Sequence, residues 1–143
     1  MKNQKSIILI TSIALIISFS SCKKSDDSVS PSGLSSTVQS GNWKVTYYND
    51  SGNDETYHFS GYQFTFASGG SVTAIKSGSS VSGSWSTGND DSTSKMVLDF
   101  GAQVPFDELN DDWKILENSS LKIRLEDVSG GDGSTDYLTF EKV

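Results

Sequence analysis

The fold is decided by residues 61–86, GYQFTFASGGSVTAIKSGSSVSGSWS. Apolar residues or glycine occupy every second position of its three runs, and the segments between the runs, 67–70 and 76–79, are turn formers rich in Ser and Gly. A period of two is typical of a β-strand that buries one face. The stretch therefore predicts three consecutive strands joined by short turns.

The same period continues outward, and we expect eight strands within residues 41–143. They are centred on Trp43–Tyr47, Tyr62–Phe66, Val72–Ala74, Val81–Trp85, Met96–Phe100, Trp113–Ile115, Leu121–Leu125 and Leu138–Phe140. Asn118-Ser119 predicts a tight hairpin, whereas 87–94 and 127–136 are predicted as longer loops. Regular spacing with short loops favours an all-β fold, an eight-stranded antiparallel up-and-down barrel, with a β-sandwich as the alternative.

One segment departs from the strand pattern. Residues 105–111 begin with Pro and continue with two acids after Phe106, which suits the first turn of a helix. We therefore expect one short helical turn there. Phe106 and Leu109 are three residues apart and can cover one end of the barrel.

Composition excludes several classes of protein. The net charge is −7, which argues against a nucleic-acid partner, because such proteins need a basic face. The chain has one Cys and one His, so a disulfide framework, a Cys-based zinc site and a multi-histidine metal site are all excluded. We expect no cofactor, no metal and no enzymatic activity.

The first 21 residues are predicted to be a secretory signal. Lys2 and Lys5 precede the apolar run SIILITSIALIISF (6–19), and small residues lead to Cys22. The run is shorter than the about 20 residues that cross a bilayer core, so a spanning helix is the weaker interpretation.

The segment Phe19-Ser20-Ser21-Cys22 resembles the lipobox of bacterial lipoproteins, although Phe replaces the usual Leu at its first position. The resemblance implies that Cys22 becomes the first mature residue and carries acyl chains, including palmitate, that anchor the protein in the membrane. The alternative is an ordinary signal peptide followed by a spare thiol.

Residues 22–40 are predicted to be a flexible tether, because this Ser-rich segment has no aromatic residue and little apolar surface to bury. Its Ser25-Asp26-Asp27 cluster resembles the surface-export signal of Bacteroidota lipoproteins. The resemblance implies an outer-membrane protein exposed at the cell surface. A periplasm-facing orientation is the alternative.

The domain itself resembles the lipocalin-like lipoproteins of Bacteroidota. The matching segments, in order, are Gly41-Asn42-Trp43, Phe59-Ser60-Gly61-Tyr62 leading into Phe64-Thr65-Phe66, Ser82-Gly83-Ser84-Trp85, Leu109-Asn110-Asp111-Asp112-Trp113 and Tyr137-Leu138-Thr139-Phe140. The family implies an eight-stranded antiparallel barrel and no established function. Ligand carriage by true lipocalins is an analogy of fold only.

The expected role is non-catalytic binding of a small apolar ligand inside a monomeric barrel. An eight-stranded barrel has an interior that side chains just fill or that holds one small ligand. The candidate lining residues are Trp43, Tyr47, Tyr62, Phe64, Trp85, Phe100 and Trp113. The alternative is a filled core, with interaction or structural function at the loops. Gly83 and Ala74 leave local room for a ligand.

Candidate chemistry is sparse. His58 follows Asp54 and Glu55, but no G-x-S-x-G motif accompanies it, and a surface histidine near acids is the simpler interpretation. The acids at 107–112 could form a carboxylate pair, although a solvated helix face explains them better. The loop 127–136 is only loosely similar to a calcium loop and lacks the EF-hand spacing.

Overall fold

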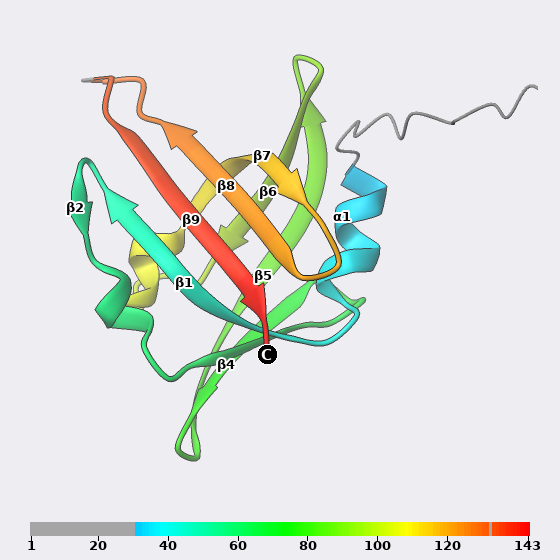
Figure 1. The fold of residues 1–143 in the computed structure, drawn as a ribbon, viewed down its shortest axis with the longest axis vertical. Coiled ribbons are helices and arrows are strands. Elements are labelled where there is room, and N and C mark those ends of the chain that lie inside the picture. Colours follow the sequence, from blue (N-terminus) through cyan, green and yellow to red (C-terminus); the bar gives the residue numbers. More distant parts are fainter. Residues whose placement is uncertain (1–30, 132) are drawn as a thin grey trace, which may run out of the picture.

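A computed structural model describes residues 31–131 and 133–143 of this protein. Its strands are β1 (Asn42–Asp50), β2 (Asn53–Asp54), β3 (Gln63–Phe66), β4 (Ser71–Lys76), β5 (Ser79–Asp90), β6 (Thr93–Asp99), β7 (Asp111–Asn118), β8 (Lys122–Val128) and β9 (Thr135–Lys142). One α-helix, α1 (Pro31–Val38), and two 3₁₀ helices, η1 (Thr56–Phe59) and η2 (Phe106–Leu109), accompany them (Figure 1).

Eight of the strands form a closed antiparallel barrel. The order is β1-β3-β4-β5-β6-β7-β8-β9, and β9 pairs back with β1, which closes the sheet. The two-residue β2 adds only to the far end of β1. The predicted up-and-down barrel of eight strands is confirmed, and its closure rules out the sandwich. This is the architecture of lipocalins.

The helical turn predicted for 105–111 is confirmed as η2. Its Phe106 and Leu109 are buried, and the indole N–H of Trp113 donates to the Leu109 carbonyl at 3.0 Å. The Phe106 ring enters the barrel and lies 5.2–5.7 Å, between ring centroids, from Phe59 and Phe100. A single inserted ring therefore fills one end of the interior.

The predicted tether is wrong for its last part. Residues 31–38 form α1, which packs against β5, β6 and β7. Leu34 and Val38 lie four residues apart, so they share one helix face, and both are fully buried. The Val38 carbonyl accepts the indole N–H of Trp43 at 2.8 Å. Two apolar residues thus hold α1 against the barrel, although its serines suggested a tether. The rest of the predicted tether, residues 22–30, lies outside the described residues.

The loop predicted for 87–94 is also wrong. β5 and β6 continue as paired strands as far as Asp90 and Thr93. Asp91 and Ser92 alone make the turn, with φ of 44° and 68°, and two consecutive left-handed residues suit the twist of a two-residue hairpin.

The described residues contain no helix with the length and apolar character needed to cross a membrane.

Candidate functional site

The barrel interior is filled by aromatic rings. Phe64 lies 5.3 Å from Phe140 and 6.4 Å from Phe100, and Phe66 lies 5.6 Å from Trp85, each pair in edge-to-face geometry. Phe64 and Phe140 have no solvent-accessible surface, so no water-sized cavity borders them. Phe64 and Phe140 are therefore core residues rather than the walls of an apolar pocket.

Five of the seven candidate lining residues are in this core: Trp43, Phe64, Trp85, Phe100 and Trp113. The room expected beside Gly83 is occupied, because a Cβ built at this position would lie 2.8 Å from the Phe100 ring. The indole N–H of Trp85 donates to the Ala67 carbonyl at 3.0 Å, so this polar atom is also satisfied inside the protein.

The placement of Tyr47 inside the barrel is wrong. A β-bulge between Val45 and Tyr47 shifts the pairing of β1 with β9 by one residue. A bulge reverses the faces of all later residues on its strand. Tyr47 is consequently 40% exposed, whereas Tyr48 is buried and its hydroxyl donates to the Glu108 carbonyl at 2.9 Å.

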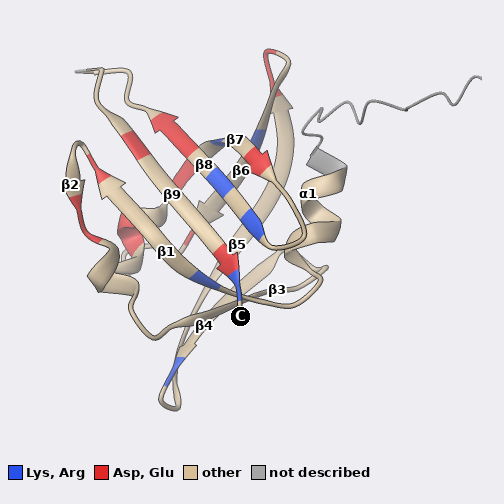
Figure 2. Ribbon diagram, in the orientation of Figure 1, with Lys and Arg blue, Asp and Glu red and all other residues tan. Residues whose placement is uncertain are grey.

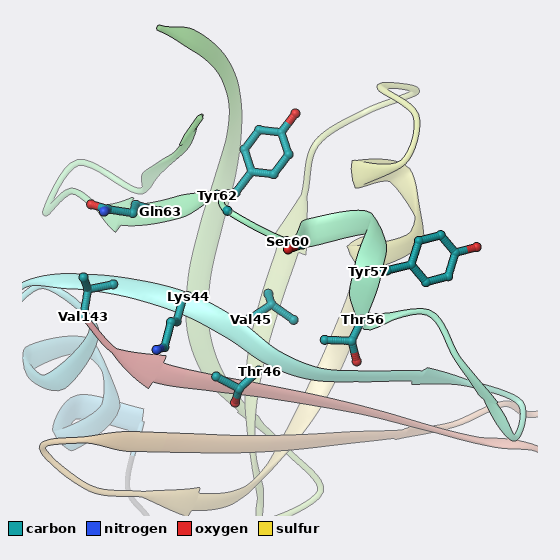
Figure 3. A pocket seen from close by; sticks show the side chains of 10 residues that line it. Lys44, Val45, Thr46, Thr56, Tyr57, Ser60, Tyr62, Gln63 and Val143 are labelled. Carbon is teal, nitrogen blue, oxygen red and sulfur yellow. The ribbon is translucent and has the colours of Figure 1, made fainter. Parts of the chain in front are cut away.

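Tyr62, the last candidate, lies at the edge of an opening in the barrel wall. Its half-buried ring packs edge-on against Phe106, with centroids 4.9 Å apart. Beside it is a surface pocket of about 510 Å³. We call this pocket the side opening; it is lined by Lys44, Val45, Thr46, Thr56, Tyr57, Ser60, Gly61, Tyr62, Gln63 and Val143 (Figure 3).

The side opening exists because β1 and β3 separate after two residue pairs. Their ladder contains only Asn42–Thr65 and Trp43–Phe64. Within the described residues, Lys44–Tyr47 of β1 therefore has no strand partner on the β3 side. Figure 3 shows β1 on one side of the gap and the segment from η1 to β3 on the other.

Thr56 ends the gap at its far side. Its hydroxyl accepts the Tyr48 N–H at 2.8 Å, and the Glu55 N–H donates to the Tyr48 carbonyl at 3.0 Å. The neighbouring Asp54 carboxylate accepts the Thr56 N–H at 3.0 Å. Hydrogen bonding to Thr56 lowers the pKa of Asp54. These contacts fix the start of η1, which carries the exposed ring of Tyr57.

Positive charge without an acidic partner gathers near the side opening. Among the described residues, Lys95, Lys114, Lys122 and Arg124 all lie within 4.0 Å of a carboxylate. No such ion pair involves Lys44, Lys76 or Lys142 in that part of the chain. Lys44 lines the opening, and the Lys76 ammonium lies 5.2 Å from the centre of the Tyr62 ring. Figure 2 shows blue segments on β1, on β4 and near the C-terminus.

Among residues 31–131 and 133–143, two groups of side chains could hold a metal ion. Glu55, His58 and Glu108 offer ligand atoms that all lie within 4.8 Å of one another, and so do Asp111, Asp112 and Asp127. His58 Nδ1 lies 2.8 Å from Glu108 Oε2. Burial, followed by repulsion from Asp111 and Asp112, raises the pKa of Asp127. Burial also raises the pKa of the Tyr48 hydroxyl, so it remains a hydrogen-bond donor.

Sequence reasoning missed the side opening and the Glu108 partner of His58. His58 and Glu108 are 50 residues apart, and no local pattern links them. Tyr57 was detectable, because an aromatic residue within the polar run Asn53–His58 has no strand alternation to bury it. Cys22 lies outside the described residues, and nothing in the structure tests its acylation.

Of the comparisons with known proteins, only the one with solved structures found proteins similar to this chain. No protein-family model and no curated protein matches the sequence. A DUF4847 family protein from Bacteroides vulgatus is 16% identical, with a TM-score of 0.46, and the match covers 74% of this chain and 94% of that one. A lipocalin-like protein from Bacteroides uniformis is 19% identical, with a TM-score of 0.45, covering 73% and 98%. An uncharacterized protein from Bacteroides eggerthii is 18% identical, with a TM-score of 0.44, covering 71% and 97%.

Proposed function

We propose that this protein is a lipid-anchored, non-catalytic binding module that captures an extended, acidic peptide segment of a partner at the side opening. The observation that carries the proposal is the unpaired Lys44–Tyr47 edge of β1 beside a pocket of about 510 Å³. The filled interior favours this role over the carriage of a small ligand.

An unpaired strand edge binds a peptide by adding it to the sheet. Backbone hydrogen bonds then give affinity, and pockets for alternate side chains give specificity. Here the opening offers Val45 at its floor and Tyr57, which is 69% exposed, at its rim. An apolar side chain of the peptide would be buried against both.

Charge selects the kind of peptide. The chain as a whole is acidic, yet Lys44 and Lys76 flank the opening without a carboxylate within 4.0 Å in the described residues. An acidic segment would supply those partners, whereas a basic one would be repelled by these two lysines. The module would act as a monomer, without a nucleic-acid partner.

Selection from a phage library of random ten-residue peptides on the full chain tests this function. We expect enriched peptides that carry Asp or Glu and alternate apolar residues. Their affinity should fall at least tenfold in Tyr57→Ala and in Lys44→Ala. The matched controls are Val128→Ala, at a similarly exposed apolar residue, and Lys114→Ala, at a lysine distant from the opening. Equal loss in variants and controls, or no enrichment, would refute the proposal.

Anchoring and location are a separate part of the proposal. The signal-like segment 1–21 and the lipobox-like Cys22 support outer-membrane attachment through acyl chains. Cys22→Ala should abolish acylation and release the protein from the membrane fraction. Protease added to intact cells should digest a surface-exposed protein and spare a periplasm-facing one. Normal membrane recovery of Cys22→Ala would refute the anchor and leave peptide binding untouched.

A further inference from the structure

The two 3₁₀ helices, η1 and η2, meet at one end of the barrel. The proposed peptide binding assigns no role to the three side chains described next. Glu55 precedes η1, His58 lies within it, and Glu108 lies within η2. His58 Nδ1 is 2.8 Å from Glu108 Oε2 and 3.8 Å from Glu55 Oε2. One imidazole nitrogen thus faces two carboxylates that come from distant parts of the chain.

The backbone around these three side chains is anchored in the core. Phe59 directly follows His58, and Phe106 lies two residues before Glu108. Both rings are buried, and their centroids are 5.7 Å apart. The Tyr48 hydroxyl donates to the backbone carbonyl of Glu108 at 2.9 Å. The His58 ring also lies 4.3 Å from the Tyr57 ring. The backbone that carries the candidate ligand atoms is therefore already held in place before any ion binds.

The spacing fits a small tetrahedral ion. Zinc lies about 2.0–2.2 Å from nitrogen and oxygen ligands, so neighbouring ligand atoms are about 3.3 Å apart. The two measured separations, 2.8 and 3.8 Å, fall on either side of that value. Side-chain rotations that move each carboxylate oxygen by about half an ångström would equalise them.

We propose that Glu55, His58 and Glu108 bind one Zn²⁺ ion, with water as the fourth ligand. A carboxylate only accepts hydrogen bonds, so Nδ1 carries the proton in its bond to Glu108. When zinc binds, the ring changes tautomer: the proton moves through solvent from Nδ1 to Nε2, and the Nδ1 lone pair binds the ion while the imidazole stays neutral. The mixed nitrogen and oxygen donors favour zinc over Mg²⁺ and Ca²⁺, which prefer oxygen ligands alone. About a quarter of each side chain is exposed, which leaves room for the water.

The second acidic group serves as an internal control. Asp111, Asp112 and Asp127 offer no nitrogen donor, and Asp112 already pairs with Lys95 at 3.2 Å. A zinc ion held by any cluster of acids would bind there as well. A zinc ion held by the imidazole would not.

Equilibrium dialysis of the full chain against Zn²⁺ alone tests the site. The background is Cys22→Ser, because a free thiol also binds zinc. We expect one ion per chain, with affinity at least tenfold lower in Glu108→Gln and in His58→Ala and unchanged in Asp112→Asn. Equal binding in all variants means adventitious binding only and overturns the proposal, as does no binding at a zinc concentration of about 0.1 mM.

Two further measurements guard against loss of folding. The chain contains one His, so its imidazole NMR signals come from His58 alone. Zinc should shift those signals in wild-type protein, and in Glu108→Gln the same shift should need at least tenfold more zinc. Zinc should also raise the melting temperature of wild type by several degrees and leave Glu108→Gln unaffected. An equal shift of Glu108→Gln and wild type at the same zinc concentration refutes the three-ligand site. Peptide selection at the side opening reads out the proposed function independently of zinc.

Discussion

The interior of the barrel and the side opening lie next to each other and have opposite exposure. Phe59, at the end of η1, is 1% exposed, whereas Tyr57, two residues earlier, is 69% exposed. The difference follows from the sheet: strands enclose the interior on all sides, but β1 and β3 share only two residue pairs. The comparison teaches that in this barrel a partner can reach the wall more readily than the interior.

Removal of the Phe106 ring, which fills one end of the interior, should have the largest effect on stability. Phe106→Ala deletes a buried ring in contact with Phe59, Tyr62, Phe64 and Phe100, leaving a cavity. We expect the free energy of unfolding to fall by about 3–5 kcal/mol, measured by urea titration. The cavity should then bind benzene, which raises the melting temperature of the variant alone. A loss below about 1 kcal/mol would mean that the interior is not tightly filled.

Gly83→Ala tests the same packing from the sheet side. A Cβ at position 83 would lie 2.5 Å from the Asp99 carbonyl oxygen and 2.8 Å from the Phe100 ring, closer than such atoms approach. Overpacking of this kind costs about 1–3 kcal/mol of stability. Gly88→Ala, on the same strand with no atom within 4 Å of the added Cβ, is the matched control. Equal stability of the two variants would show that β5 and β6 separate easily.

The strands and η2 were predictable because their signals are local. Alternation with a period of two placed every barrel strand, because strands such as β3, β4 and β6 bury alternate residues along part of their length. The position of Tyr47 was not predictable, because the bulge before it depends on the pairing of β1 with β9. Leu121, expected to face inward, is exposed because it precedes β8 in the turn.

The remaining errors concern contacts between distant segments. Two buried residues, Leu34 and Val38, dock α1, and a Ser-rich composition hides so small an apolar face. The side opening depends on where β3 leaves β1, and the His58–Glu108 contact depends on how η1 meets η2. Local periodicity carries no information on such contacts.

Tyr48→Phe tests the contact between β1 and η2. The substitution keeps the buried ring and removes the hydroxyl that donates to the Glu108 carbonyl. We expect a loss of about 1–2 kcal/mol in the free energy of unfolding, because a half-buried carbonyl loses its partner. Tyr57→Phe, at an exposed ring, should leave stability unchanged. If both variants behave alike, the hydroxyl of Tyr48 does not hold η2 in place.

Asp127→Asn should have the smallest effect and gives a surface reference for the other three. Burial and repulsion by Asp111 and Asp112 raise the pKa of Asp127, so folding disfavours its charged form. Its contribution to stability therefore becomes less favourable as pH rises above 3.8, its ordinary value, through the raised pKa. Removing the charge should raise the melting temperature at pH 7 by roughly one to three degrees.

The sign of the pH dependence separates this electrostatic cause from a change in packing. Below pH 3 the Asp127 carboxyl is protonated in the folded and unfolded states alike, so Asp127→Asn and wild type should then melt together. Asp107→Asn, at an exposed acid of η2, controls for the change in net charge. A stabilisation that persists at pH 2.5, or that Asp107→Asn reproduces, would contradict the assignment. A difference confined to higher pH would show that charge, rather than packing, limits stability at this surface.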